Sequence, residues 1–217
     1  MSPPSSRIRL VLLDADGVVQ ELSHGWLSTV ERVCGDPQRT ADFLKAFYAM
    51  EAMFMAGEEG VGAALAKLVG AWNASCTMEE AMQLWWSIAP HPGMFTAIAA
   101  VRAGGTAVSL ASNQQPERAR YMSQALGYEK AFDACFYSCH LGYAKPDPAY
   151  FHAILRASGT PAGEVLFLDD RPANVEAARS TGMQAEVFDI ASGVGPFLQI
   201  LQRHGLHRGA PSAQEPR

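Results

Sequence analysis

The feature that most constrains the fold is an alternation of short apolar runs with helical patterns. Runs of strand length occupy residues 8–13, 106–111, 133–138, 164–168 and 185–188. Each run is almost continuously apolar, which is typical of strands buried on both faces of a sheet. Helical patterns occupy residues 95–103, 116–126, 146–158 and 173–180. This alternation predicts βαβ units, and therefore an α/β fold with a doubly wound parallel sheet.

One interval does not fit a simple alternation. About ninety residues separate the first two apolar runs, although a crossover needs only about a dozen. Helical patterns fill the interval at residues 25–34, 40–55, 60–72 and 78–88. We therefore predict a core over residues 7–19 and 91–203, a helical cap domain inserted after strand one over residues 20–90, and a flexible tail over residues 204–217. The alternative is that the inserted helices extend the core itself.

Composition and charge exclude several classes of protein. Hydrophobic residues make up 48% of the chain, which is enough for a substantial core. The formal net charge is −5 and no cluster of Lys and Arg is present, so nucleic acid is not an expected partner. The apolar run at residues 10–13 is too short for a signal peptide or a membrane span. The four cysteines form no CxxC pair, which favours reduced thiols. We predict a cytoplasmic protein with no membrane partner.

Two aspartates follow the first apolar run directly. Asp14 and Asp16 are two residues apart, so their side chains would share one face if the strand continued. Carboxylates held together repel each other and need a cation or a shared proton. Mg²⁺ suits such oxygen ligands and leaves coordination positions for a substrate phosphate. The alternative is an ordinary turn, because Asp and Gly17 are common turn residues.

Three further polar groups follow later apolar runs. Ser112 and Asn113 can hold phosphoryl oxygens at the start of a helix, or they can simply cap that helix. Lys145 can neutralise a carboxylate and a phosphoryl group, or it can be a solvated surface lysine. Asp169 and Asp170 are adjacent acids at a strand tip. Their partner is either a metal ion or the neighbouring Arg171.

These four groups are predicted to converge on one site. Each lies at or just beyond the carboxyl end of a predicted strand. If strand one is central, its neighbours bring Ser112 and Asp170 to either side of Asp14. That crevice is where open α/β sheets bind ligands.

The motifs resemble those of a known family. The segments DADGV, ASN, GYAKPDPAYF and LFLDDRPANVEAARSTGM are similar, in order and spacing, to motifs one to four of the haloacid dehalogenase (HAD) superfamily. The helical insertion resembles the C1 cap of its subfamily I, and the resemblance covers residues 8 to 203. It implies a HAD-like, Rossmannoid core. One departure is Cys139-His140-Leu141, which stands where relatives often carry an acidic residue.

The resemblance also implies roles for individual residues. Asp14 would be the nucleophile that forms an aspartyl-phosphate, and Asp16 the general acid and then the general base. Ser112, Asn113 and Lys145 would bind the phosphoryl group, with Ser112 and Lys145 as part of the catalytic set. Mg²⁺ would be held by Asp14, by the backbone carbonyl of Asp16 and by Asp170. Asp169 would lie behind these ligands or orient Lys145.

The implied function is a Mg²⁺-dependent phosphatase of small phosphorylated metabolites. Family dehalogenases lack the second acid of motif one, so Asp16 favours phosphate chemistry. Family phosphomutases keep that acid, so a sugar-phosphate phosphomutase stays an alternative, as do a dehalogenase and a non-catalytic binding protein. Either a monomer or a homodimer is compatible with the sequence. His24, Trp85 and Trp86 either line the substrate pocket or serve packing and surface roles.

Overall fold

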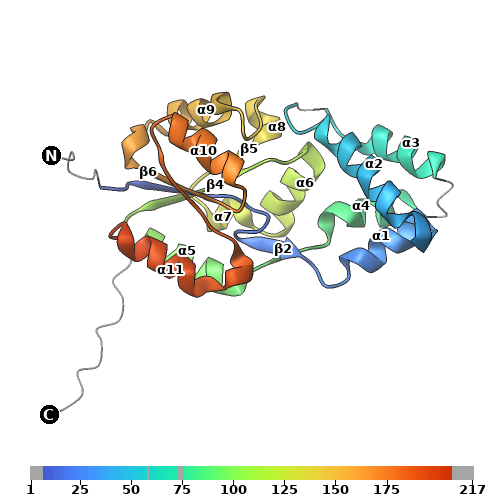
Figure 1. Ribbon diagram of the computed structural model, residues 1–217, viewed down its shortest axis with the longest axis horizontal. Helices are drawn as coiled ribbons and strands as arrows, with labels where there is room; N and C mark the ends of the chain where they lie inside the picture. The colour runs from blue at the N-terminus through green and yellow to red at the C-terminus, as the bar shows by residue number, and fades with distance from the viewer. Residues whose placement is uncertain (1–6, 58, 73–75, 207–217) are drawn as a thin grey trace, which may run out of the picture.

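A five-stranded parallel sheet forms the centre of the protein, with strand order β5-β4-β1-β6-β7. The computed structural model describes residues 7–57, 59–72 and 76–206 (Figure 1). The central strand β1 lies between β4 and β6, as predicted, and all four neighbouring pairs are parallel. The predicted α/β fold is therefore confirmed. The strands are β1 (Leu10–Leu13), β4 (Ala107–Ser112), β5 (Cys135–Tyr137), β6 (Val165–Asp169) and β7 (Gln184–Val187).

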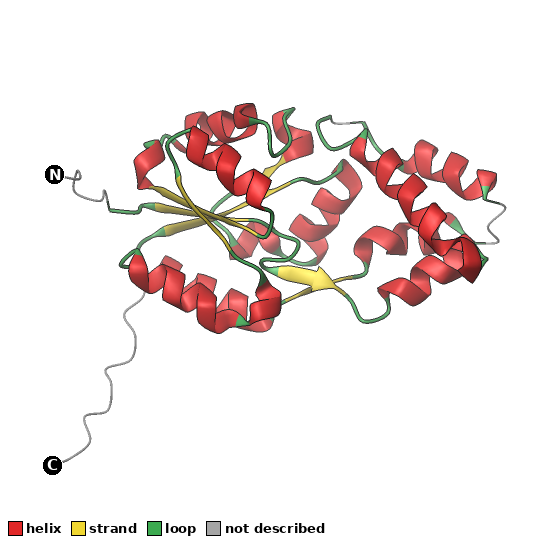
Figure 2. Ribbon diagram, in the orientation of Figure 1, coloured by secondary structure: helices red, strands yellow, loops and turns green. Residues whose placement is uncertain are grey.

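Helices cover both faces of this sheet (Figure 2). Helices α5 (Pro92–Ala103) and α11 (Val194–Arg203) pack on one face, and α9 (Pro148–Ser158) and α10 (Pro172–Ser180) pack on the other. The side chains of β1 alternate between the two apolar layers because successive residues of a strand point to opposite faces. Val11 and Leu13 join the first layer, and Leu10 and Leu12 join the second. A strand buried on both sides explains the continuous apolar run LVLL.

The long insertion after β1 builds an apolar core of its own. Its helices are α1 (Trp26–Cys34), η1 (Pro37–Arg39), α2 (Thr40–Ala52), α3 (Gly62–Ala71) and α4 (Met78–Trp86). Every member of the apolar cluster between them comes from this segment, and its centre includes Phe43, Phe47 and Leu65. In Figure 1 these helices form a lobe beside the sheet. We refer to residues 23–87 as the cap.

Two short strands connect the cap to the core. Strand β2 (Gln20–Leu22) pairs antiparallel with β3 (Ile88–Pro90), so the chain enters and leaves the cap side by side. Neither strand was predicted, because three residues such as Gln20, Glu21 and Leu22 give no apolar run or clear alternation.

Helix α6 (Pro116–Arg120) makes a second connection between core and cap. Its Glu117 accepts a hydrogen bond from the backbone N–H of Val61 at 3.2 Å. The predicted helix over residues 116–126 is interrupted, since α6 gives way to a π-helical turn at Tyr121–Ala125. The remaining short helices are α7 (Tyr128–Ala131), α8 (Ser138–Leu141), η3 (Ala162–Glu164) and η4 (Ile190–Ser192).

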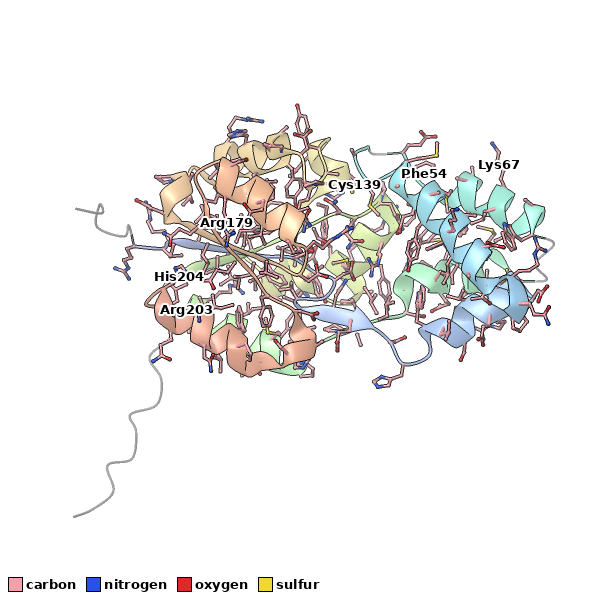
Figure 3. All side chains as sticks on the ribbon, viewed as in Figure 1. Phe54, Lys67, Cys139, Arg179, Arg203 and His204 are labelled. Carbon is pink, nitrogen blue, oxygen red and sulfur yellow. The ribbon has the colours of Figure 1, made fainter. Side chains whose placement is uncertain are left out.

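The end of α11 is held against β7. Glu186 on β7 accepts a hydrogen bond from Arg203 and pairs with His204, both labelled in Figure 3. His204 therefore packs on the core, although we predicted that the flexible tail begins there. Residues 207–217 of that predicted tail lie outside the described residues. Among the described helices, none is both long and apolar enough to cross a lipid bilayer.

Candidate active site

Strand register places two of the predicted acids at the same level. Leu13 pairs with Leu168 across β1 and β6, so the next residues along, Asp14 and Asp169, lie side by side at the carboxyl ends of these strands. The backbone N–H of Asp14 donates to the Leu168 carbonyl at 2.9 Å, which continues the ladder to this point. Both side chains are buried, with Asp14 7% and Asp169 0% exposed. Parallel pairing alone thus brings together acids that are far apart in the chain.

Lys145 stands between these two carboxylates. Its Nζ lies 2.8 Å from Asp14 Oδ1 and 2.6 Å from Asp169 Oδ2, and it donates to the Ala111 carbonyl at 2.8 Å. Burial opposes its charge, but the two carboxylates outweigh that effect and raise the pKa of Lys145. The ammonium group is therefore charged at neutral pH. The interpretation of Lys145 as a solvated surface residue is excluded, because its side chain is 1% exposed.

The surroundings of Asp14 disfavour its charge. Burial is the main cause, and the charges of Asp169 and Asp16 add to it, so the pKa of Asp14 is raised to about 7 despite the pull of Lys145. Its Oδ1 atom also accepts a hydrogen bond from the backbone N–H of Ala15 at 2.6 Å. Because the ionised form of this carboxylate is disfavoured, any further cation placed beside it stabilises that form.

Asp169 is fully engaged by the protein. Its oxygens accept hydrogen bonds from the Arg171 backbone N–H at 2.9 Å and from Asn174 Nδ2 at 2.9 and 3.0 Å. Together with Lys145, these donors leave Asp169 little capacity for a ligand. The geometry matches the role of orienting Lys145, one of the two alternatives stated for Asp169.

Asp170 completes a cluster of three acids. One carboxylate oxygen from each of Asp14, Asp169 and Asp170 lies within 4.8 Å of the others. Gly17 makes room for this arrangement: its φ is +74°, and a Cβ atom there would lie 2.8 Å from Asp170 Oδ2. Burial and the neighbouring Asp169 raise the pKa of Asp170. Hard oxygen donors with disfavoured negative charge fit Mg²⁺ well, with Asp14 and Asp170 as the side chains free to bind it.

The close approach of Gly17 to Asp170 gives a first prediction. Gly17→Ala is expected to displace the Asp170 carboxylate, because both the positive φ and the space disfavour a side chain. We expect Mg²⁺ affinity to fall by about tenfold or more, on the scale of misplaced metal ligands. Isothermal titration with Mg²⁺ measures this, and Gly35→Ala is the control for a positive φ with open space around it. Equal Mg²⁺ affinities in the two variants would contradict the prediction.

Asp16 lies outside the acidic cluster and faces a different partner. Arg118 Nη1 and Nη2 each donate to its carboxylate at 2.7 Å, and Gln20 and Gln114 add bonds at 2.9 and 3.1 Å. Burial opposes ionisation, but Arg118 outweighs it and lowers the pKa of Asp16. Because the carboxylate faces a cavity, the side chain keeps 44% of its surface accessible. The metal ligand expected at this position was the backbone carbonyl, and the Asp16 side chain takes no part in the cluster.

Ser112 and Asn113 both lie at the end of β4, and their side chains have protein partners. Ser112 Oγ accepts a hydrogen bond from Gln114 Nε2 at 3.0 Å and is buried. The amide of Asn113 exchanges two 2.8 Å bonds with the backbone of Lys145. Asn113 therefore fixes the loop that carries Lys145, while both residues also line the cavity above Asp14.

A cavity of about 710 Å³ joins these residues to the cap. On the core side it is lined by all the predicted site residues except Asp169. On the cap side, Trp85 lines it, whereas Trp86 stacks on Tyr121 at a separate hollow. His24 is exposed and is not among the residues that line the cavity.

Several residues of the site were not predicted from the sequence. They are Gln20, Gln114 and Arg118, which hold Asp16, Asn174, which holds Asp169, and Glu51 on the cap wall. Asn174 lies in the segment that resembles motif four, and the sequence alone gives it no role beyond helix capping or support of that motif. Arg118 lies one helical turn after Gln114, on the helix that follows Ser112, and that placement was the one available signal. Nothing in the sequence indicated that Glu51 belongs to the site, because an acid at the end of a helix is usually solvated.

Similar proteins include several phosphatases. The chain is 28% identical over 141 residues to a phosphoglycolate phosphatase of Rhodospirillum rubrum, covering 57% of this chain and 58% of that protein. It is 34% identical over 100 residues to phosphatase MT3486 of Mycobacterium tuberculosis, covering 46% of each. Other relatives are much longer: the chain matches 11% of drimenol cyclase drtB of Aspergillus calidoustus and 11% of mouse acyl-CoA dehydrogenase family member 10.

Solved structures share the fold. A predicted HAD-like hydrolase of Porphyromonas gingivalis superimposes with a TM-score of 0.73 at 21% identity, covering 91% of this chain and 99% of that one. The magnesium complex of the HAD family enzyme bt-2542 of Bacteroides thetaiotaomicron gives a TM-score of 0.74 at 16% identity, covering 88% and 98%. The sequence profile of the haloacid dehalogenase-like hydrolases matches residues 8–182, which is most of the chain. The protein therefore belongs to the haloacid dehalogenase-like hydrolase family.

Proposed function

We propose that the protein is a Mg²⁺-dependent phosphatase that hydrolyses small phosphorylated metabolites through an aspartyl-phosphate on Asp14. The observation that carries this proposal is the placement of Asp14. Its buried carboxylate lines the cavity, 2.8 Å from the Lys145 ammonium and beside the Asp170 carboxylate. A carboxylate nucleophile held beside a cation suits phosphoryl transfer, because the transition state of that reaction is stabilised mainly by position and charge.

In the first step, an oxygen of Asp14 attacks phosphorus while the bond from phosphorus to the ester oxygen breaks. Lys145 offsets negative charge on the nucleophile and on the transferring group, because its ammonium lies within contact distance of Asp14. Asn113 keeps the Lys145 backbone in place through its two hydrogen bonds. The monoanionic phosphate ester brings a proton into the site, and Asp16 passes this proton to the leaving oxygen, which departs as an alcohol.

In the second step, water attacks the phosphorus of the aspartyl-phosphate. Asp16 takes a proton from that water, and the bond between phosphorus and Asp14 breaks to release inorganic phosphate. The pairing with Arg118 favours the ionised form of Asp16, which is the form that accepts this proton. Mg²⁺, held by Asp14 and Asp170 and by the backbone carbonyl of Asp16, would supply further charge neutralisation on the phosphoryl oxygens.

The named relatives support phosphate chemistry. Besides the two phosphatases above, a GMP/IMP nucleotidase of Escherichia coli is 29% identical over 85 residues. Haloacid dehalogenases share the fold too, for example the L-2-haloacid dehalogenase RSc1362 at 17% identity and a TM-score of 0.65. Fold likeness does not separate these activities, but the second acid of motif one, Asp16, favours the phosphatase. A cytoplasmic location and a monomer or homodimer stay predictions.

Metal removal and product identification test this function. In the presence of Mg²⁺, the protein is expected to release inorganic phosphate from p-nitrophenyl phosphate. Treatment with EDTA should abolish turnover, and added Mg²⁺ should restore it, because the charges of Asp14 and Asp170 then have a cation again. Hydrolysis that is indifferent to chelation would remove the metal from the mechanism. Halide release from a 2-haloacid, or isomerisation of a sugar phosphate without phosphate release, would replace the phosphatase assignment.

A further inference from the structure

The cap side of the cavity differs in chemistry from the core side. The core side carries the charged groups that surround Asp14, whereas large apolar and aromatic side chains dominate the cap side. These residues are Trp26, Phe47, Tyr48, Met55, Leu84 and Trp85. A polyhydroxylated organic group placed here would lose hydrogen bonds to water with few replacements, because Tyr48 and Glu51 are the polar side chains on this side, and each lost bond is costly. The wall instead favours an apolar or aromatic group of substantial size, since the cavity holds about 710 Å³.

One acid interrupts this apolar wall. Glu51 lies in the last turn of α2, lines the cavity, and is 7% exposed. Burial raises the pKa of Glu51, and the negative end of a helix adds to the cost of a carboxylate there. Arg118 and Trp85 favour its charged form, and Asp16 opposes it. Glu51 is therefore a largely buried acid whose ionised form is disfavoured by its surroundings.

The neighbours of Glu51 leave it able to accept a hydrogen bond from a ligand. Arg118 directs its guanidinium elsewhere, to Asp16, to Gln114 at 3.0 Å and to the Trp85 carbonyl at 3.1 Å. Trp85 interacts with Glu51 and favours its charged form, but the buried Nε1 atom of Trp85 does not reach full hydrogen-bond geometry with any described residue. Within residues 7–57, 59–72 and 76–206, no ion pair to Glu51 is formed either. A buried acceptor without a full partner is satisfied when a bound molecule supplies a donor.

We propose that the organic part of the substrate is largely apolar and carries one hydrogen-bond donor, a hydroxyl or an ammonium group, which Glu51 accepts. Glu51 is then a specificity-determining residue and takes no part in the bond changes at phosphorus. The inference rests on the proposed phosphatase function, and it narrows the substrate class from phosphate esters in general to esters of apolar alcohols with a single further polar group. Simple polyols and sugars fall outside that class.

Matched pairs of substrates test the proposal. Each n-alkyl phosphate from propyl to octyl is compared with the ω-hydroxyalkyl and ω-aminoalkyl phosphates of the same length, with glycerol 3-phosphate as the polar reference. We expect kcat/KM to favour the longer n-alkyl phosphates over glycerol 3-phosphate. At one chain length, the terminal donor should raise kcat/KM by about ten- to a hundredfold, the scale of a hydrogen bond to a charged acceptor. In Glu51→Gln and Glu51→Leu, the ratio of kcat/KM with the terminal donor to kcat/KM without it should fall towards one.

Two control variants separate Glu51 from other acids. Glu21 also lines the cavity but is exposed, and Glu79 is an exposed acid on α4 away from it. Glu21→Gln and Glu79→Gln should leave the ratio within the pair as in the wild type. A ratio that responds to Glu21→Gln and not to Glu51→Gln would overturn the assignment, as would a wild-type preference for glycerol 3-phosphate.

A binding measurement separates failure of this inference from failure of the phosphatase function. Alkyl- and hydroxyalkylphosphonates are titrated against the Mg²⁺-loaded protein, with quenching of tryptophan fluorescence as readout, because Trp26 and Trp85 line the cavity. If no phosphate ester is hydrolysed, the phosphatase function fails, yet a hydroxyalkylphosphonate preference lost in Glu51→Gln would still support the donor site. If esters are hydrolysed but neither kinetics nor binding depends on Glu51, the inference alone is wrong.

Discussion

Asp14→Asn is expected to lower phosphatase kcat by roughly 10⁴-fold or more, the scale seen when a covalent nucleophile is lost. The amide cannot form the aspartyl-phosphate, whereas the other groups of the site stay in place. Hydrolysis of p-nitrophenyl phosphate with saturating Mg²⁺ measures the loss. Turnover near the wild-type level would remove Asp14 from the role of nucleophile.

The same variant is expected to stay folded. Burial raises the pKa of Asp14 to about 7, which means that folding disfavours its charge, and a neutral amide of similar size escapes that cost. Lys145 keeps Asp169 as its partner, 2.6 Å away. In Mg²⁺-free buffer, the midpoint of thermal unfolding should therefore equal or exceed that of the wild type. Asp42→Asn, at an exposed position of α2, is the matched control for both activity and stability.

Lys145→Met is expected to impair both activity and stability. The substitution leaves Asp14 and Asp169 buried side by side without their shared cation, and breaking a buried ion pair in this way costs about 3–5 kcal/mol. Urea unfolding followed by circular dichroism should show the loss as a lower midpoint. Phosphatase activity should fall by at least about a hundredfold, because the charge beside the nucleophile is gone.

A surface lysine provides the comparison for that result. Lys67, labelled in Figure 3, is exposed on α3 of the cap. Lys67→Met should change the free energy of unfolding by no more than about 0.5 kcal/mol, as for most surface substitutions. If the two variants unfold at the same urea concentration, Lys145 does not have the central electrostatic position assigned to it.

The sheet was predictable because each buried strand leaves a local apolar run in the sequence. The run LVLL of β1 is buried on both faces, and so is VLFLD of β6, and this burial selects continuous apolar residues. The positions of Asp14 and Asp169 followed from the same pattern, since parallel strands bring their carboxyl ends to one edge. Residues positioned directly by the strand ends could therefore be predicted from the sequence.

The partners of those residues could not be found in the same way. Gln20 donates a hydrogen bond to Asp16 from the first residue of β2. Arg118 reaches Asp16 from α6 and also donates a hydrogen bond to the Trp85 carbonyl of the cap. Such contacts depend on how the cap and α6 pack together, and no periodicity in the sequence encodes that packing. The same holds for Glu51, whose burial arises because α2 faces the core across the cavity.

The paired strands β2 and β3 have a consequence for how proteins of this architecture can diversify. Gln20 lies opposite Pro90 and Leu22 opposite Ile88, so the backbone enters and leaves the cap at one place, as it does around a hairpin loop. Closing a loop of any length between fixed ends changes the chain entropy only slowly with its length. A different helical unit could therefore be grafted between positions 22 and 88 without moving Asp14, and new recognition could arise on unchanged chemistry.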